Sequence, residues 1–403
     1  MKPLHITGEK LQRKIMRARP WTPTALILRI SNLFPEIRPA FLELVSVIED
    51  VPSPGAHLFE SIRKNGKVLP WFLVSALWML EHFVPLMITD AVLRFVIINL
   101  MFPFFLVKDE LSYIKMEKKF EEEGADVILD IVGEEAKTPR DAEVYLNSYL
   151  YDMRRFGGKI SVKPSSLVPS LVFFANTYEE NKLLLKEKLR VLFTEGKHSD
   201  AEITVDAEEY FKWCHLTEDA FLEVIMEPEF RDMENEVGIV LQTYRKDVFA
   251  SLERIVSVAK QRKYPLRVRV VKGAYWGAEH SIAFDLEEKF PLFERKEDTD
   301  WSFNATVSLL LKYKDHIRVS VASHNAKTIA HAISECHGDY SLVEYEVLVG
   351  MGESIRRVLC KMKIPVSVYC PRIRKNGCIK EGMAYLIRRL DEVATSSCVL
   401  KNI

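Results

Sequence analysis

The chain has 403 residues, of which 48% are hydrophobic and 28% are charged, with 56 Lys and Arg against 57 Asp and Glu. This composition excludes a disordered or low-complexity chain and indicates a globular protein with a large core. The formal net charge of −1 gives no bulk attraction for nucleic acid, so we expect no nucleic-acid partner. The six cysteines form no Cys-x-x-Cys pair, which speaks against a disulfide framework or a cysteine-rich zinc site.

The first hundred residues predict an α-helical region. Thr24–Phe34 and Ala40–Glu49 carry apolar residues at helical spacing, and Val51–Gly55 interrupts the pattern. The first twenty residues hold six Lys and Arg against one acid, but no apolar stretch of a secretory signal follows. A transit peptide is the alternative for this cationic segment.

Residues 68–107 are strongly apolar. Glu81, Asp90 and Arg94 divide this segment into pieces shorter than the roughly 18 to 20 residues that a membrane-spanning helix needs. We therefore expect buried helices here, with a peripheral membrane contact as the alternative.

After Lys108 the pattern changes to strands that alternate with helices. The predicted strands are Val127–Val132, Lys159–Lys163, Glu202–Asp206, Val237–Gln242, Arg267–Lys272, Ile317–His324, Tyr345–Gly350 and Val366–Tyr369. The clearest predicted helices are Asp141–Arg155, Glu179–Phe193, Arg245–Lys260, Ala326–Glu335 and Lys380–Glu392. Eight such units favour a (β/α)8 barrel over an open doubly wound sheet, which would carry a Gly-x-Gly-x-x-Gly turn after its first strand. The expected organisation is an α-helical region over 1–104 and a barrel domain over 105–403.

Polar residues follow the predicted strands, and barrel enzymes hold their reacting groups at the carboxyl ends of the strands. These residues are Asp130, Glu134, Lys163, Asp206, Glu208, Glu209, Gln242, Arg269, Lys272, His324, Asn325, Glu353 and Tyr369. Taken singly, each could also be a solvated loop residue or part of an ion pair at the barrel rim. Their presence at nearly every strand end favours an active site.

The last predicted helix carries a second polar pattern. Glu381, Tyr385, Arg388, Arg389 and Glu392 fall on one face, which is also typical of an ordinary amphipathic surface helix. The functional interpretation is that two guanidinium groups beside a tyrosine hydroxyl bind a carboxylate.

The histidines show no metal-binding pattern. His280, His331 and His337 form neither a His-Glu-x-x-His nor a His-x-His set, so no metal site is predicted.

The segment Val268–Trp276 reads Val-Arg-Val-Val-Lys-Gly-Ala-Tyr-Trp and resembles the fifth strand of the proline dehydrogenase family. Further motifs of that family follow in the expected order over residues 105–403. They are Ile160–Lys163, Thr204–Glu209, Val240–Tyr244, Ser323–Ala326, Gly350–Glu353, Tyr369–Pro371 and Tyr385–Arg389. Residues 21–100 are only loosely similar to the helical arm before the barrel in the bifunctional proline-utilisation proteins.

The resemblance implies a distorted (β/α)8 barrel whose eighth helix lies over the barrel mouth and closes a non-covalent FAD site. It implies oxidation of L-proline to Δ1-pyrroline-5-carboxylate, the first step of proline catabolism to glutamate, with electrons passed through the flavin to a membrane quinone. Because the chain ends after the barrel, we expect a separate pyrroline-5-carboxylate dehydrogenase. The expected location is cytoplasmic with peripheral membrane association, and the alternative is the mitochondrial matrix or inner membrane.

The resemblance also assigns roles to residues. Arg388 and Arg389, together with Lys163, would bind the substrate carboxylate, and Asp206 would pair with Lys163 and orient it. Arg269 would donate to the flavin near its reacting nitrogen, which makes Lys163, Asp206 and Arg269 the predicted catalytic residues. The other predicted flavin contacts are Ala207, Gln242, Lys272, Gly273, Ala274, Trp276, Ser323 and His324. Tyr275, Tyr369 and Tyr385 would form the wall of the proline pocket.

The sequence also departs from the family pattern. Gly277 replaces an acid, Glu346 stands where Gln is usual, Pro164 follows the lysine, Ser323 replaces Thr, and Arg372–Gly377 lengthens the loop after the last strand. Because that loop borders the expected substrate site, a hydroxyproline dehydrogenase is an alternative. A second alternative is a flavin-binding barrel without activity that serves as a regulator or scaffold.

Overall fold

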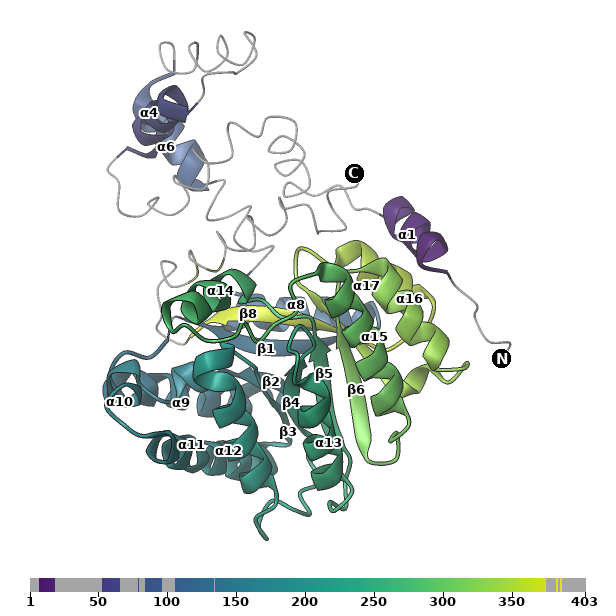
Figure 1. Cartoon of the computed structure of the whole chain (residues 1–403). Coiled ribbons are helices and arrows are strands. Elements are labelled where there is room, and N and C mark those ends of the chain that lie inside the picture. The colour runs from purple at the N-terminus through teal and green to yellow at the C-terminus, as the bar shows by residue number, and fades with distance from the viewer. Residues whose placement is uncertain are drawn as a thin grey trace.

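The computed structural model describes residues 7–18, 53–65, 79, 84–95, 106–133, 135–374, 382 and 385. Within this part of the chain, eight parallel strands pair in chain order and close into a barrel, which confirms the predicted fold class (Figure 1). The strands are β1 (Asp126–Val132), β2 (Gly158–Val162), β3 (Ala201–Val205), β4 (Val237–Gln242), β5 (Leu266–Val271), β6 (Ile317–Ala322), β7 (Val343–Leu348) and β8 (Val366–Ile373).

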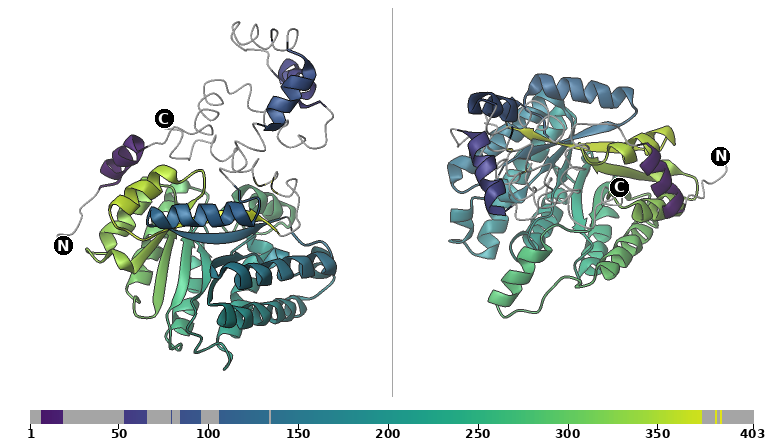
Figure 2. Two further views of the ribbon diagram at one scale, coloured as in Figure 1. Left: turned by 180° about the vertical axis from the view of Figure 1, so that it is seen from behind. Right: turned by 90° about the horizontal axis from the view of Figure 1, so that it is seen from above.

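Helices surround the strands, as the view from above in Figure 2 shows. They are α8 (Glu110–Glu122), α9 (Pro139–Phe156), α10 (Ser170–Phe173), α11 (Tyr178–Ser199), α12 (His215–Ile225), α13 (Val248–Ala259), α14 (Trp276–Asp285), α15 (Lys296–Leu311), α16 (Ala326–Glu335) and α17 (Glu353–Lys361). A 3-10 turn over Pro164–Ser166 follows β2, and a π-helical turn over Tyr210–Cys214 precedes α12. Capping residues explain where two of the helices begin. Thr138 caps α9 and Thr177 caps α11, each in a capping box.

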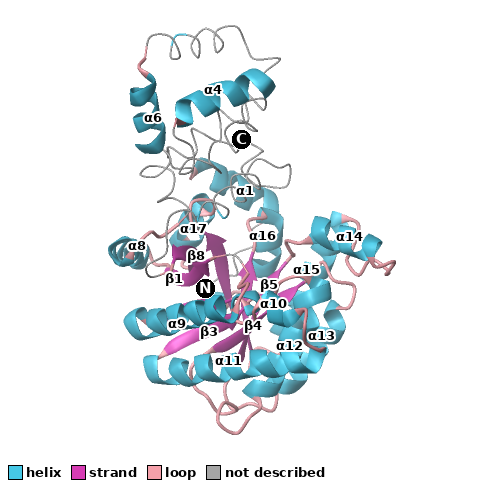
Figure 3. Cartoon of the chain, turned by 90° about the vertical axis from the view of Figure 1, so that its left-hand side faces the viewer, coloured by secondary structure: helices cyan, strands magenta, loops and turns pink. Residues whose placement is uncertain are grey.

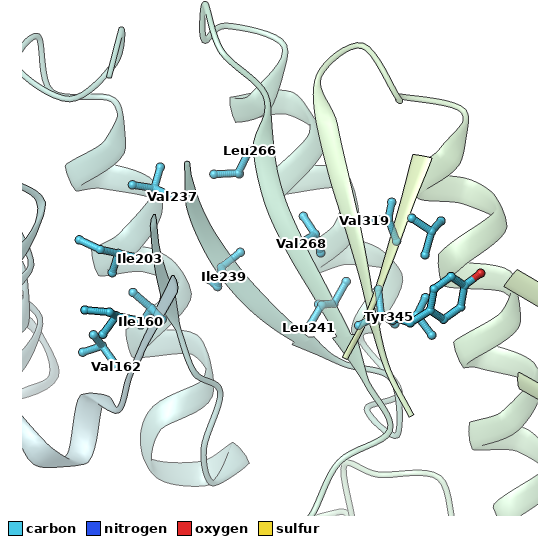
Figure 4. Packing of buried hydrophobic residues seen from close by; sticks show 14 of the residues in the cluster. Ile160, Val162, Ile203, Val237, Ile239, Leu241, Leu266, Val268, Val319 and Tyr345 are labelled. Carbon is cyan, nitrogen blue, oxygen red and sulfur yellow. The ribbon is translucent and has the colours of Figure 1, made fainter. Parts of the chain in front are cut away.

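The outward faces of the strands are apolar and pack against the helices. Ile160 and Val162 of β2, Ile203 of β3 and Val268 of β5 belong to one buried cluster (Figure 4). These residues alternate along each strand with polar residues that face the barrel interior. Burial of this layer removes each side chain from water, which is worth about 1.5 to 3 kcal/mol for a Val, Leu or Ile.

The barrel interior is filled largely by charged and hydroxyl side chains. Interiors of such barrels are usually packed with Val, Ile and Leu. In this chain the interior positions hold Asp130, Lys159, Ser161, Glu202, Arg267, Arg269, Ser320, Glu344, Glu346, Ser367 and Tyr369. An interior of this kind can remain folded only because its charges are paired.

Strand β8 is longer than the sequence predicts. It continues to Ile373, so Arg372 lies in the strand. The prediction that Arg372 belongs to the loop is therefore wrong. The reason is a buried ion pair: Arg372 Nε donates to Asp152 Oδ2 of α9 at 3.1 Å. The loop that follows β8 therefore begins after Ile373.

Helix α1 (Gly8–Arg17) packs against α16 and α17 on the outside of the barrel (Figure 3). Its Leu11 and Ile15 are buried. This contact attaches part of the predicted 1–104 region to the barrel.

Helices α4 (Pro54–Asn65) and α6 (Leu86–Phe95) lie against each other (Figures 1 and 3). Ser53 Oγ donates to Asp90 Oδ1 at 3.1 Å and links the two. The exposed side chains of α6 are Leu86, Met87, Ile88, Val92 and Phe95, at 40 to 79% of their area. The prediction that residues 68–107 form buried helices is therefore wrong for α6, because a pair of short helices cannot cover all of its apolar side chains.

None of the helices in the described ranges is both long and apolar enough to span a bilayer. The predicted helices Thr24–Phe34 and Ala40–Glu49, and Lys380–Glu392 apart from residues 382 and 385, lie outside the described residues.

Candidate active site

Arg269 of β5 is the centre of a buried polar cluster inside the barrel. Its Nη1 donates to Ser161 Oγ of β2 and to Asp206 Oδ1 after β3, both at 2.7 Å. Its Nε lies 2.6 Å from Glu346 Oε2 of β7. The guanidinium group is therefore held between two carboxylates from opposite sides of the barrel.

Lys163 follows β2 and forms an ion pair with Asp130 of β1. Its Nζ donates to both carboxylate oxygens, at 2.6 and 2.7 Å, and to the Ile131 carbonyl at 3.3 Å. The expected pair between Lys163 and Asp206 is therefore wrong. The register explains the difference: Asp130 lies beside Ser161, two residues before Lys163, so the lysine reaches across to the neighbouring strand.

Tyr369 of β8 completes the group. Its hydroxyl donates to Asp206 Oδ2 at 3.0 Å, and Arg269 Cζ lies 5.4 Å from the centre of its ring. Tyr369 thus lies beside the predicted catalytic residues Asp206 and Arg269. We call the following seven residues the mouth cluster: Asp130, Ser161, Lys163, Asp206, Arg269, Glu346 and Tyr369.

Burial controls the protonation of the mouth cluster. It raises the pKa of Asp130, against the opposing charge of Lys163, and it raises the pKa of Glu346, against that of Arg269. Burial alone would lower the pKa of Arg269, but Glu346 and Asp206 together raise it. The cluster contains three carboxyl groups and two basic groups, so full ionisation would leave a buried net negative charge.

Glu208 connects the two loops that carry Lys163 and Asp206. Its Oε2 accepts from the Ser165 backbone N–H at 2.7 Å, and its Oε1 accepts from Ser165 Oγ at 2.6 Å. Burial raises the pKa of Glu208 to about 7, although these hydrogen bonds oppose the shift. Glu208 therefore acts between the loops and does not reach into the barrel.

Gln242, at the end of β4, is a predicted flavin contact. Its side chain is buried, and Nε2 donates to the Glu208 carbonyl at 3.3 Å. Its Oε1 is buried without a hydrogen-bond donor. A buried amide oxygen of this kind costs folding free energy unless a donor forms a hydrogen bond to it.

The segment after β5 is open to solvent. Gly273 has φ +126°, and a Cβ at this position would lie 2.5 Å from Tyr244 ring atoms, so only glycine fits here. Ala274 and Trp276 are exposed, with Trp276 Nε1 donating to the Phe293 carbonyl at 3.0 Å. This segment presents backbone and an aromatic side chain to a ligand.

The remaining predicted flavin contacts lie at neighbouring strand ends. Lys272 is paired with Asp300 of α15, and His324 Nε2 accepts from the Leu348 backbone N–H at 3.0 Å. Ser323 Oγ accepts from the Asn325 backbone N–H at 3.1 Å. Ala207 follows Asp206 directly and is half-buried.

Two of the strand-end candidates, Asn325 and Glu353, make structural contacts. Asn325 caps α16 by accepting from the backbone of Lys327 and Thr328. Glu353 is paired with Arg356 within α17. Glu209 immediately precedes the π-helical turn.

Two of the predicted pocket tyrosines, Tyr275 and Tyr385, lie in the described part of the chain. Tyr275 is half-buried before α14, and Tyr385 is buried. Arg388, Arg389 and Glu134 lie outside the described residues, so the proposed carboxylate clamp stays a prediction.

A family model described as proline dehydrogenase matches residues 113–401. The chain belongs to the proline dehydrogenase family. This match spans every strand of the barrel and the whole mouth cluster.

Relatives of this family are about 25 to 30% identical to the chain over the residues that match. The Bifunctional protein PutA of Escherichia coli is 30% identical over 306 residues, which cover 71% of this chain and 23% of that protein. The human Proline dehydrogenase 1, mitochondrial, is 25% identical over 254 residues, covering 60% of this chain and 41% of that protein. The chain thus matches only a part of the length of these relatives.

A solved structure has the same fold. Proline utilization A from Bdellovibrio bacteriovorus, inactivated by N-propargylglycine, matches with a TM-score of 0.80 and 25% identity. The match covers 98% of this chain and 42% of that chain. The barrel agrees with membership of the proline dehydrogenase family, and it is this membership that indicates an oxidoreductase.

Two members of the mouth cluster were not predicted as site residues. Ser161 lies two residues before Lys163, and Glu346 was noted only as a departure from the family motif. Side chains two apart on a strand share a face, so both could have been assigned to the barrel interior from the sequence. The contact of each with Arg269 depends on strands far apart in the chain.

Proposed function

We propose that this chain oxidises L-proline to Δ1-pyrroline-5-carboxylate and that it binds FAD non-covalently as the hydride acceptor. The observation that carries the proposal is the mouth cluster. Lys163, Asp206, Arg269 and Tyr369 occupy family motif positions on different strands and come together at one end of the barrel. Barrel enzymes use this end for chemistry.

The substrate is a zwitterion, so its carboxylate needs a cationic partner. Lys163 is partly exposed and fixed by Asp130, which leaves it able to contact an anion at the barrel mouth. In the proposal, Arg388 and Arg389 bind the same carboxylate, and Tyr275, Tyr369 and Tyr385 enclose the ring. Fixing the ring in one orientation removes much of the entropic barrier to hydride transfer.

The residues present fit FAD. The buried Oε1 of Gln242 has no donor and could accept from the N–H edge of a flavin ring. Gly273 permits close approach of backbone, and Trp276 and Lys272 lie on the same segment. When bound, FAD supplies the acceptor for the hydride. Arg269, held by Asp206 and Ser161, would offset the negative charge that develops during reduction.

The proposed electron acceptor is a membrane quinone, reached by peripheral docking of a cytoplasmic protein; the mitochondrial inner membrane is the alternative location. The exposed apolar side chains of α6 support a membrane contact. The protein should wash off membranes with carbonate or high salt. Retention that yields only to detergent would contradict peripheral docking.

Flavin absorption tests the proposed function. The purified protein should absorb between roughly 370 and 460 nm, and anaerobic L-proline should bleach this absorption. Hydroxyproline and pipecolate in the same assay distinguish the substrate alternatives. Flavin that none of the three bleaches would favour the regulator or scaffold alternative, and a protein without flavin would contradict the proposed function.

The carboxylate clamp has its own test. Arg388→Met or Arg389→Met should weaken proline binding by about 2 to 4 kcal/mol while FAD stays bound, because a charge-assisted contact is lost. Saturation by proline at the parent concentration in either variant would exclude that residue from the clamp.

A further inference from the structure

Glu346 of β7 is a buried carboxylate that the proposed reaction does not use. Its side chain is 2% exposed, and Oε2 lies 2.6 Å from Arg269 Nε. This ion pair lacks hydrogen-bond geometry, and the Ser320 hydroxyl lowers the pKa of Glu346 by less than burial raises it. A carboxylate in this state is poorly stabilised in its charged form.

The other two carboxylates of the mouth cluster accept more hydrogen bonds than Glu346. Asp130 accepts from Lys163 through both oxygens. Asp206 accepts from Ser161, Arg269 and Tyr369. Because hydrogen bonds to the charged form favour ionisation, Glu346 is the carboxyl group of the three that most readily holds a proton.

Groups on several strands surround Glu346. Arg269 and Arg267 act on it from β5, Ser320 from β6 and Glu344 from its own strand. Tyr369 of β8 and Asp206 after β3 reach it through Arg269. The two arginines and the Ser320 hydroxyl favour its charged form, whereas burial and Glu344 oppose it, so no single cation fixes its charge.

We propose that Glu346 is a positioning residue that carries a proton of the mouth cluster and, by releasing it as the pH rises, reduces the positive charge that Arg269 offers to a bound flavin. This inference rests on the proposed function. It concerns a position at which the family motif has Gln, so a titratable group here is a property of this chain.

The ion pair between Glu346 and Arg269 sets the direction in which the flavin midpoint potential should change with pH. With Glu346 protonated, Arg269 faces one carboxylate, Asp206; with Glu346 ionised, it faces two. A second nearby negative charge makes reduction of the flavin less favourable. The midpoint potential should therefore fall more steeply with pH in the parent protein than in a variant that cannot ionise at residue 346.

Glu346→Gln is the direct test, since it keeps the size of the side chain and removes the titration. The midpoint potential of the protein-bound flavin is measured by spectroelectrochemical titration across the stable pH range. Parent and variant should agree at low pH and diverge as the pH rises, with the variant at the higher potential. Parallel profiles would overturn the proposal.

Glu344→Gln is the matched control. Glu344 is a carboxylate on the same strand that contacts Arg267, Lys159 and Ser367 but not Arg269. Its variant should keep the fall of the potential with pH, displaced to lower pH because the charge of Glu344 that opposes ionisation of Glu346 is removed. If both variants flatten the profile equally, the effect belongs to the barrel interior in general, and the assignment to Glu346 fails.

A readout without flavin separates this proposal from the proposed function. Burial raises the pKa of Glu346 in the folded protein, so its contribution to stability is present at low pH and is lost as the pH rises through that pKa. Urea unfolding across pH should show this loss in the parent and less of it in Glu346→Gln. A flavin-free protein would contradict the proposed function, whereas identical unfolding profiles would contradict the role of Glu346.

Discussion

Two charged layers lie inside the barrel, and each surrounds an arginine of β5. Arg267 lies two residues before Arg269 and pairs with Glu344, Glu236 and Glu202. Its Nη1 also donates to Ser320 Oγ at 2.8 Å. Both layers thus place an arginine of β5 among carboxylates. The layer of Arg267 lies farther from the barrel mouth, and we call it the deeper layer.

The two layers differ in how the β7 carboxylate beside each arginine is stabilised, although burial also raises the pKa of Glu202 in the deeper layer. Burial opposes ionisation of Glu344, but Arg267 and Lys159 outweigh it and lower its pKa to about 2. Burial prevails in the mouth cluster, where it raises the pKa of Asp130 and Glu346. Glu344 contacts two cations and a hydroxyl group, which keep it ionised. Glu346 pairs with one cation, so it can change its protonation. We therefore expect the deeper layer to serve stability and the mouth cluster to serve chemistry.

The largest expected effect is that of Arg267→Met. It leaves several carboxylates in the barrel without their partner, which should cost about 3 to 5 kcal/mol of unfolding free energy. Urea denaturation at neutral pH measures this loss. Arg318→Met, an exposed arginine on the neighbouring strand β6, is the control and should change stability by less than about 0.5 kcal/mol. Equal losses in the two variants would remove the distinction between the layers.

Arg269→Met should act mainly on the reaction. Loss of its charge next to the flavin should lower kcat/KM by about 10² to 10³, or about 3 to 4 kcal/mol of the barrier. Its cost in stability should be smaller than that of Arg267→Met, because Glu346 can take up a proton. Steady-state kinetics and urea denaturation give both numbers. Arg269→Lys should retain charge but slow flavin reduction, since the planar fork is lost.

Glu208→Gln tests the pH dependence of stability. The folded protein raises the pKa of this carboxyl group from 4.5 to about 7, so the parent loses stability as the pH rises through this window. The variant should lack that loss, which we expect to be on the order of 1 to 3 kcal/mol. Unfolding midpoints at pH 5 and 8 compare the two. A parent without any change across the window would show that Ser165 keeps Glu208 ionised.

The smallest expected effect comes from a pair of serines. Ser161→Ala removes one contact to Arg269, and Ser367→Ala removes one contact to Lys159 in the deeper layer. Each should cost about 1 kcal/mol of unfolding free energy. Only Ser161→Ala should also lower kcat/KM, by less than about tenfold. A matching loss of activity in Ser367→Ala would mean that the layers are coupled.

Much of the fold could be predicted from the sequence. The strand Val237–Gln242 and the helix Ala326–Glu335 have the predicted bounds, and no predicted strand of the barrel begins more than about two residues from its observed start. Local periodicity suffices for this, since burial of one face imposes a period of two on strands and 3.6 on helices. The exposed face of α6 was not predictable, because apolar composition does not say what covers it.

The sequence by itself determined the family, the barrel and the set of strand-end groups, including Lys163, Asp206 and Arg269. Only the tertiary structure decided which of these groups contact each other. It pairs Lys163 with Asp130, places Glu346 against Arg269, and joins Glu208 to Ser165. The physical reason is that strand order, register and closure bring together residues as distant in the sequence as Asp206 and Tyr369, which are 163 positions apart, and no local pattern encodes such a contact.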